Sequence, residues 1–284
     1  MLATGLVAGP DASPAGAPAA TQIPTRIVSL VPSVTEMLFA IGAGPSVAGV
    51  GSFDREPPEI DRLPRVGGLL DPDIERILSL RPDLAVVYES QTDLRQQLEL
   101  ARIPLFVYTH AGLTDVTQTL RELGRRVGRS QEADRLAASI DRDLSAVRAR
   151  VRGRTRPRTL LVFAREPRTL RNIYVSGGVG FLHDMLEAAG GTNVFGDVRR
   201  QSLQVTTETL LRIAPEVIVD LRYSGEIRPD DIPSERDAWS ALSSVPAVRT
   251  GRIHVLVGDE FVIPGPRVAA ATAKLARALH PDAF

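Results

Sequence analysis

ERILSLRPDLAVV at residues 75–87 and ETLLRIAPEVIVD at residues 208–220 share one pattern. In each segment a glutamate begins a short amphipathic helix, a proline (Pro82 or Pro215) interrupts it, and a run of aliphatic residues is typical of a buried strand. The repeat predicts an α/β fold of two Rossmann-like lobes, each with a central parallel sheet. A ligand is expected in the cleft between two such lobes.

Residues 130–152 predict a single long helix between the two halves. Its apolar residues recur at spacings of four and three, which gives one apolar stripe: Leu136, Ile140, Leu144, Val147 and Val151. At 1.5 Å per residue, a helix of about 22 residues is about 33 Å long, which is enough to span both lobes. The predicted organisation is therefore a disordered linker or remnant of an export signal (1–25), an N-terminal lobe (26–129), the bridging helix (130–152) and a C-terminal lobe (153–284).

Three polar residues are predicted to cap helices. SVTE at 33–36 reads as a capping box in which Ser33 caps the helix and Glu36 reaches back to it. Asp71 is predicted to cap the helix that begins at Pro72, and Ser130 the long helix.

Composition excludes several functional classes. The 284 residues are 43% hydrophobic, which is ample for a core in each lobe, and carry 34 basic and 34 acidic side chains. This balance disfavours nucleic acid as a partner, because phosphate neutralisation needs a basic face. Cysteine is absent, so the chain has no disulfide and no thiolate metal site.

No motif supports an enzyme or a resident cofactor. The glycines at 177–180 lack the full dinucleotide fingerprint and the P-loop lysine, and no GxSxG elbow occurs. The four histidines, His110, His183, His254 and His280, show no metal-ligand spacing. We therefore expect no catalytic residues, no cofactor and no bound metal of the protein's own.

Two features lie where ligands bind in open α/β sheets. His110 follows the strand 104–108 at its carboxyl end, although a surface-loop role is also open. Arg165, Arg168 and Arg171 follow the strand 158–163 and could form a fork for a carboxylate or phosphate, or simply be solvated.

Three segments resemble the helical-backbone (class III) periplasmic binding proteins, which are the substrate-binding components of ABC importers for cobalamin, haem and ferric siderophores. They are RIVSLVPSVTEMLFAIGAG (26–44), VAGVGSFDREPPEIDRLPRVGG (47–68) and DPDIERILSLRPDLAVV (71–87). The resemblance covers about residues 25–281 and is strongest to the cobalamin-binding branch. It implies a monomeric extracytoplasmic protein that captures a small molecule and delivers it to an ABC permease and ATPase complex.

The resemblance also implies site residues. One exposed glutamate on each lobe docks to the permease in this family, and these positions fall at Glu75 and Glu208. The resemblance places the ligand contacts at Phe53, Leu69, Tyr88 and Ser202. We expect Pro32, His110, Arg165, Asp259 and Phe261 to contact the ligand as well.

The nature of the ligand stays open at this point. A corrinoid such as cobalamin is the first hypothesis, with aromatic faces at Phe53 and Tyr88. The alternative is a ferric siderophore or haem, since Tyr88, Tyr108 or His110 could ligate haem iron. Trp239 is interpreted as structural. An enzyme on the same two-lobed fold is disfavoured, because such enzymes need cysteines that bind metal clusters.

Overall fold

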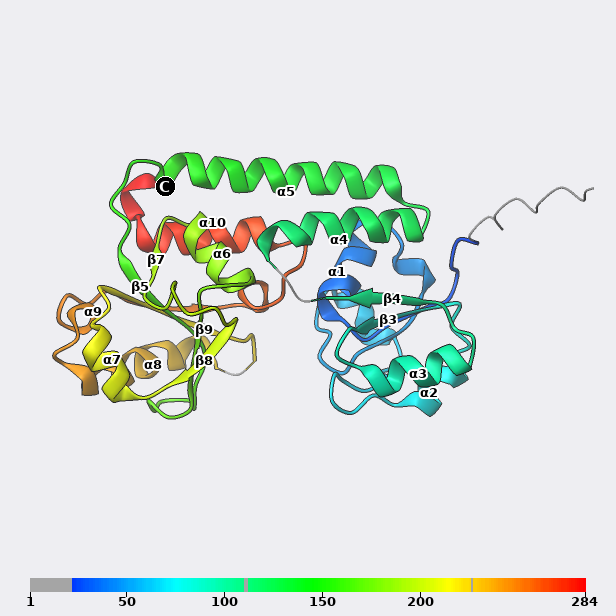
Figure 1. The fold of residues 1–284 in the computed structure, drawn as a ribbon, viewed down its shortest axis with the longest axis horizontal. Coiled ribbons are helices and arrows are strands. Elements are labelled where there is room, and N and C mark those ends of the chain that lie inside the picture. The colour runs from blue at the N-terminus through cyan, green and yellow to red at the C-terminus, as the bar shows by residue number, and fades with distance from the viewer. Residues whose placement is uncertain (1–21, 110–111, 226) are drawn as a thin grey trace, which may run out of the picture.

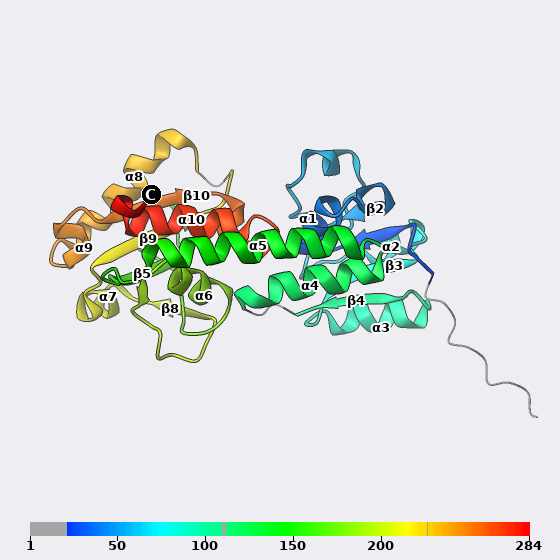
Figure 2. The ribbon, with the colours of Figure 1, turned by 90° about the horizontal axis from the view of Figure 1, so that it is seen from above.

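The computed structural model describes residues 22–109, 112–225 and 227–284. Two α/β lobes stand side by side, and the helix α5 (Ser130–Val151) runs along one edge of both (Figures 1 and 2). Among the described residues, no helix combines the length and apolar character that a bilayer crossing requires. The predicted two-lobed α/β fold is confirmed.

The N-terminal lobe is built around a parallel sheet with strand order β2-β1-β3-β4. Its elements are β1 (Ile27–Ser29), α1 (Pro32–Ala40), β2 (Val47–Val50), α2 (Ile74–Ser79), β3 (Leu84–Tyr88), α3 (Thr92–Leu100), β4 (Leu105–Tyr108) and α4 (Leu113–Arg126). Successive strand residues point to opposite faces. Leu84 and Val86 therefore join the core under α1 and α4, whereas Ala85 and Val87 join a core with residues of α2 and α3.

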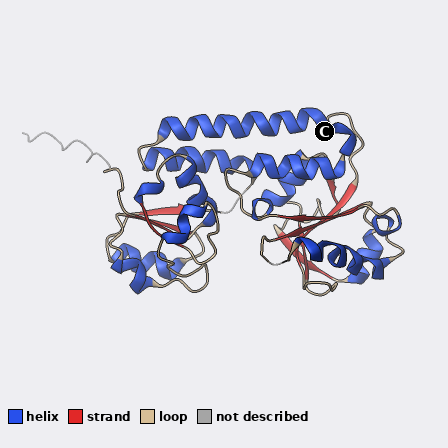
Figure 3. Cartoon of the chain, turned by 180° about the vertical axis from the view of Figure 1, so that it is seen from behind, coloured by secondary structure: helices blue, strands red, loops and turns tan. Residues whose placement is uncertain are grey.

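The C-terminal lobe has a mixed sheet, with strand order β10-β9-β5-β6-β8 and the short β7 also paired with β5. Its elements are β5 (Arg158–Ala164), β6 (Ile173–Ser176), α6 (Phe181–Ala188), β7 (Thr192–Asn193), β8 (Ser202–Val205), α7 (Thr207–Ile213), β9 (Val217–Arg222), α8 (Ile232–Asp237), α9 (Pro246–Arg249), β10 (Ile253–Val257) and α10 (Val268–Leu279). β10, β9, β5 and β7 are parallel, as predicted, but β6 and β8 are antiparallel additions at one edge. Figure 3 shows both sheets between their helices.

The apolar stripe of α5 belongs to one core that continues through both lobes. Its buried residues are Ala133, Ala137, Ile140, Leu144, Val147 and Val151, with Leu136 partly buried. α4 packs along α5, and α10 and α6 pack on it as well. The approach of α4 is close, because a Cβ added at Gly124 would lie 2.3 Å from the Cβ of Ala133. The bridging helix is thus a packed joint and not a tether.

The three predicted caps are wrong. The N-cap of α1 is Val31, with Pro32 as its first residue, and both Ser33 and Glu36 are buried. Glu36 instead accepts two hydrogen bonds from Arg267, a residue far along the chain. The cap of α2 is Asp73, whose carboxylate accepts from the Arg76 amide at 2.9 Å, and Arg129 precedes α5 at the cap position without a side-chain bond.

The repeat extends to the backbone conformation. In each half the short helix is followed by a non-glycine residue in the left-handed region, Arg81 (φ 48°) in one and Ala214 (φ 50°) in the other. Pro82 or Pro215 follows, and then the buried strand β3 or β9. A left-handed residue at a helix end turns the chain sharply into the next element. The two halves therefore reverse direction by the same turn.

Candidate ligand-binding site

A cavity of 610 Å³ lies between the two lobes. Its N-terminal wall comes from the segments after β1 and β2, the loop 68–71, and Tyr88 at the end of β3. Its C-terminal wall comes from residues 223–225 after β9 and from residues after β10. Both walls thus follow the carboxyl ends of parallel strands, where open α/β sheets bind ligands. The size is in the range of small-molecule sites.

Five of the residues predicted to contact the ligand line this cavity. They are Pro32, Phe53, Leu69, Tyr88 and Asp259. Phe53 is 65% exposed and so presents an aromatic ring to solvent at the cavity. Tyr88 is half-buried and packs edge-on against Tyr108, with ring centroids 5.9 Å apart. Burial raises the pKa of the Tyr88 hydroxyl, which keeps it protonated.

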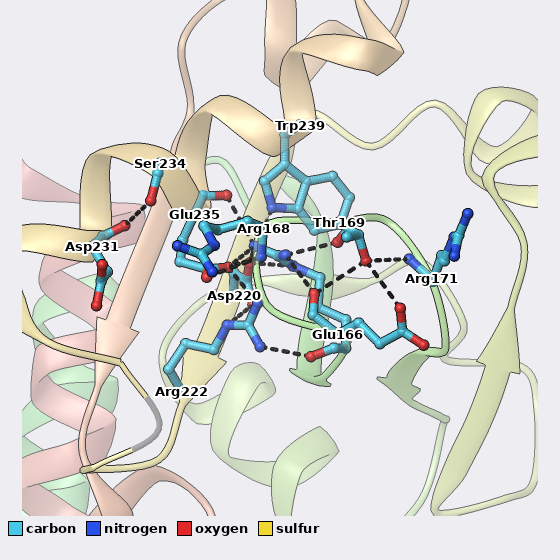
Figure 4. A network of polar contacts seen from close by, with 11 residues as sticks. Glu166, Arg168, Thr169, Arg171, Asp220, Arg222, Asp231, Ser234, Glu235 and Trp239 are labelled. Carbon is cyan, nitrogen blue, oxygen red and sulfur yellow. Dashed lines mark hydrogen bonds and ion pairs between the residues drawn. The ribbon is translucent and has the colours of Figure 1, made fainter.

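Arg165 does not line the cavity, and neither do Arg168 and Arg171, so the arginine fork that the sequence left open is not part of the site. The Arg165 guanidinium is fully buried and contacts Asp220 at 2.7 Å and Glu235 at 2.8 Å. Arg222 binds the same Glu235 at 2.6 Å, and the indole of Trp239 donates to Asp220 at 3.0 Å (Figure 4). These partners lie far from Arg165 in sequence and hold it inside the lobe. Trp239 was interpreted as structural, and its hydrogen bond to the buried Asp220 agrees with that interpretation.

The other predicted contacts also lie elsewhere. Ser202 begins the edge strand β8 and pairs with Ser176, and it does not line the cavity. Phe261 is buried in the core next to α10. Tyr108 is buried behind Tyr88, and His110 falls outside the described residues.

The remaining histidines have packing roles. His280 is buried with its Nε2 3.1 Å from the Gly190 carbonyl oxygen, and His183 Nδ1 lies 3.3 Å from the Asn193 amide. Burial lowers the pKa of His254 on β10. Within the described ranges, no three His, Asp or Glu side chains gather closely enough to hold a metal ion.

Sequence reasoning missed the other residues of the cavity, among them Asp54, Leu70 and Tyr223. Leu70 is 94% exposed, and Tyr223 extends the aromatic lining to the second lobe. Asp54 and Tyr223 lie just beyond the carboxyl ends of β2 and β9. Their position just after a strand could have identified both as candidate site residues.

Asp54 is a buried carboxyl group on the cavity wall. It is 3% exposed, and neither carboxylate oxygen has a hydrogen-bond partner among the described residues. Desolvation raises its pKa to about 7, and the nearby Thr35 hydroxyl and Arg65 guanidinium offset only part of this rise. Arg65 donates to the backbone oxygen of Asp54 at 2.7 Å. A buried carboxyl group that no ion pair of the described residues engages therefore stands at the site.

Asp259 organises the opposite wall. It is buried, and its Oδ1 accepts a hydrogen bond from the Ser224 amide at 2.8 Å. This bond fixes the segment 223–225 that lines the second lobe. Arg55 reaches toward the same segment, because its Nη1 lies 3.7 Å from where a Cβ added at Gly225 would stand. Arg55 is the single cationic side chain among the described residues that line the cavity.

Polar contacts also join the lobes directly. Arg267, which precedes α10, forms a bidentate ion pair with Glu36 of α1, with a shortest distance of 2.6 Å. Burial raises the pKa of Glu36, and the Arg267 guanidinium offsets part of that rise. The Leu113 amide at the start of α4 donates to Asp184 of α6 at 2.9 Å. Together with α5, these contacts restrict how the lobes rotate.

Glu75 and Glu208, the expected docking residues, lie in the first turns of α2 and α7. Both are exposed, and neither lines the cavity. Figure 1 places α2 and α7 on the side of the molecule away from α5, one on each lobe.

Comparison with known proteins agrees with this geometry. A model of the periplasmic binding protein family matches residues 27–259. The chain is 29% identical over 266 residues to an uncharacterised ABC transporter substrate-binding lipoprotein, YvrC, of Bacillus subtilis, covering 92% of this chain and 82% of that one. It is also 29% identical over 256 residues to the vitamin B12-binding protein of Salmonella typhimurium, covering 89% and 90%.

Solved structures show the same fold. The periplasmic haem-binding protein RhuT of Roseiflexus superimposes with a TM-score of 0.77 at 28% identity, covering 91% of this chain and 99% of that one. The vitamin B12-binding protein BtuF of Vibrio cholerae has a TM-score of 0.75 at 22% identity, covering 91% and 98%.

The chain therefore belongs to the periplasmic binding protein family. It is a non-enzymatic, extracytoplasmic substrate-binding protein of an ABC importer, within the group that takes up cobalamin, haem and siderophores. The predicted family, the absence of enzymatic function and the extracytoplasmic location are confirmed.

Proposed function

We propose that the interlobe cavity binds a corrinoid such as cobalamin, and that the protein delivers it to an ABC permease. The charge of the cavity lining is the observation that carries this proposal. Asp54, Asp71 and Asp259 line the cavity, against Arg55 as the cation. A ligand with several carboxylates would meet these acids without matching cations, and desolvating it there would be costly.

A corrinoid fits this lining better. Its ring offers broad apolar faces, and its edge carries neutral amides, which can donate hydrogen bonds to carboxylate oxygens. Phe53, Tyr88 and Tyr223 supply aromatic surface from both lobes. Aromatic contacts of this kind contribute about 0.5–1.5 kcal/mol each beyond burial. Arg55 is available for the one phosphate of cobalamin.

A ferric siderophore or haem is the second candidate. Tyr88 supports it, because a tyrosine oxygen can ligate ferric iron. Burial raises the pKa of Tyr88, however, so iron would have to displace a tightly held proton. Haem also carries two carboxylates, which the acidic lining disfavours.

Calorimetric titration of the purified protein tests the ligand. Cyanocobalamin, haemin and a ferric hydroxamate siderophore are compared at the same pH and ionic strength, and we expect cyanocobalamin to bind most tightly. Tyr88→Ala should weaken that binding several-fold through loss of aromatic contact. Tyr174→Ala is the matched control, because Tyr174 is exposed on β6 outside the cavity. Tight haemin binding without cyanocobalamin binding would refute the corrinoid assignment.

Delivery is proposed to use Glu75 and Glu208. One carboxylate per lobe, at equivalent places in the repeat, suits a two-fold symmetric permease with one arginine pocket in each subunit. Removing one partner of a desolvated charge pair costs about 2–5 kcal/mol. The double variant Glu75→Arg/Glu208→Arg should abolish uptake and leave ligand affinity unchanged, since neither residue lines the cavity. Normal uptake by this variant would exclude docking through these residues.

A further inference from the structure

The helices α2 and α7 each expose a leucine beside the docking glutamate. We propose that Leu78 and Leu211 form the apolar half of a two-part contact with the permease, Glu75 with Leu78 and Glu208 with Leu211. The partner surface is then two-fold symmetric, and each half presents an apolar recess next to a cationic side chain. This inference rests on the proposed delivery function and adds what the partner must look like.

The exposure of both leucines is unusual for their helices. Leu78 is 40% exposed and Leu211 is 45% exposed, whereas the preceding residues, Ile77 and Leu210, are fully buried. Each helix therefore has its own core residue, and the leucine that follows it keeps a large part of its surface in solvent. An apolar side chain held partly in water is stabilised when a partner covers it.

Each leucine lies on the same helix face as its glutamate. Residues three apart on a helix are neighbours on its surface, so Glu75 lies next to Leu78 and Glu208 next to Leu211. No ion pair or hydrogen bond engages either glutamate side chain in the part of the chain that the structure describes. An unpaired carboxylate beside exposed apolar surface is complementary to a cation beside an apolar recess.

The repeat gives both contacts the same local geometry. Each helix is capped by a side-chain oxygen, from Asp73 or Thr206, and each is followed by the same left-handed turn at Arg81 or Ala214. The leucine and glutamate therefore leave both lobes from equivalent positions. Figure 1 shows α2 and α7 on one side of the molecule, opposite α5. Two equivalent contacts on one side match a symmetric partner.

Other exposed apolar side chains do not share this arrangement. Phe53, Leu69, Leu70 and Tyr223 belong to the ligand cavity. Leu100 is 79% exposed at the end of α3, and it has no counterpart among the exposed apolar residues of the second lobe. Leu100 is therefore the matched control for a non-specific apolar effect.

Apolar contact also strengthens the ion pairs. Side chains that exclude water around a charged contact lower the local dielectric, and binding energy concentrates in such desolvated spots. Exposed ion pairs alone are worth little. The leucines thus supply affinity, and the glutamates supply the match to the partner's charges.

Binding to the permease–ATPase complex tests the inference. The probe is the membrane complex that copurifies with the tagged wild-type protein, reconstituted in nanodiscs, with affinity read by biolayer interferometry. Leu78→Ser and Leu211→Ser should each weaken binding about tenfold or more, as expected for loss of one buried leucine. Leu100→Ser should bind like the wild type. Unchanged melting temperatures will establish that the variants are folded.

Each result separates the inference from the proposed function. If the leucine variants bind normally while Glu75→Arg/Glu208→Arg does not, docking stands and the leucine contact is refuted. If neither set weakens binding, or no permease complex copurifies, docking on this face fails as well. An equal loss of binding with Leu100→Ser would overturn the inference in favour of non-specific apolar binding. If the wild type is a dimer on size-exclusion chromatography and Leu78→Ser/Leu211→Ser is a monomer, self-association would explain the exposed leucines instead.

Discussion

Two sites of buried charge, one in each lobe, differ in how they are paired. The C-terminal lobe encloses Arg165, Arg222, Asp220 and Glu235 at 0–1% side-chain exposure, and each of these charges contacts an opposite charge. The N-terminal lobe buries the Asp54 carboxyl on the cavity wall without a hydrogen-bond partner in the described ranges. The ion-paired network fixes structure, although Asp220 Oδ1 and Arg222 Nε lie 3.3 Å apart without a hydrogen bond. A buried carboxyl group without an ion pair at a cavity is instead a candidate for contact with a ligand. The comparison separates structural from functional buried charge.

The largest expected effect comes from breaking the paired network. Glu235→Ala leaves Arg165 and Arg222 to share Asp220, and removing one partner of a buried ion pair costs about 3–5 kcal/mol. We expect a loss of that size in the free energy of unfolding, measured by urea denaturation. Asp230→Ala, an exposed acid nearby, should change it by less than about 0.5 kcal/mol. Similar values for both variants would contradict the structural role of the network.

Asp54 should give a pH-dependent effect instead. Its pKa is raised from 3.8 to about 7 in the folded protein, so the folded state binds the proton more tightly than the unfolded state does. The associated stability is present below pH 4 and is lost as the pH rises through 7, by up to about 4 kcal/mol. Asp54→Asn cannot ionise and should not show this loss.

The measurement compares the free energies of unfolding of the wild type and of Asp54→Asn between pH 4 and pH 8. We expect Asp54→Asn to gain stability relative to the wild type as the pH rises. Ser52→Ala, a nearby exposed change without a titratable group, should follow the wild-type profile. Parallel profiles for Asp54→Asn and the wild type would show that Asp54 is not the buried acid described here.

A third prediction concerns helix α5, which belongs to the core of both lobes. Ala146 is exposed on α5, and a proline there removes a backbone hydrogen bond and clashes with the preceding turn, at a cost of about 3 kcal/mol. Ala146→Gly should cost only about 1 kcal/mol. Because the α5 stripe belongs to a core that continues through both lobes, we expect the wild type to unfold in one calorimetric transition. Two separated wild-type transitions would show that the lobes are energetically independent.

Local and repeated features could be predicted from the sequence. The long helix, the strand that follows each repeat helix and the cavity at the strand ends all depend on periodicity or on neighbouring residues. Phe53 and Tyr88 were predicted at the ligand from the family resemblance, and both line the cavity.

Long-range pairing could not be predicted. Arg165 was expected at the cleft because it follows a strand, but its partners Asp220 and Glu235 are remote in sequence. Glu36 likewise pairs with Arg267 across the lobes and not with its own helix end. Tertiary packing determines which charged residues form ion pairs, and the periodicity of the sequence does not predict those pairs.

The smallest expected effect tests how closely the lobes match. Asp73 caps α2 with a hydrogen bond of 2.9 Å from the Arg76 amide, and Thr206 caps α7 with one of 3.3 Å from the Thr209 amide. Replacing either cap by alanine should cost about 1 kcal/mol, and more at Asp73, because its bond is shorter and its negative charge interacts favourably with the helix N-terminus. Asp73→Asn retains an acceptor without the charge and should recover most of the loss. Chemical denaturation of the three variants gives the comparison, and a larger loss for Thr206→Ala than for Asp73→Ala would contradict this account of the two caps.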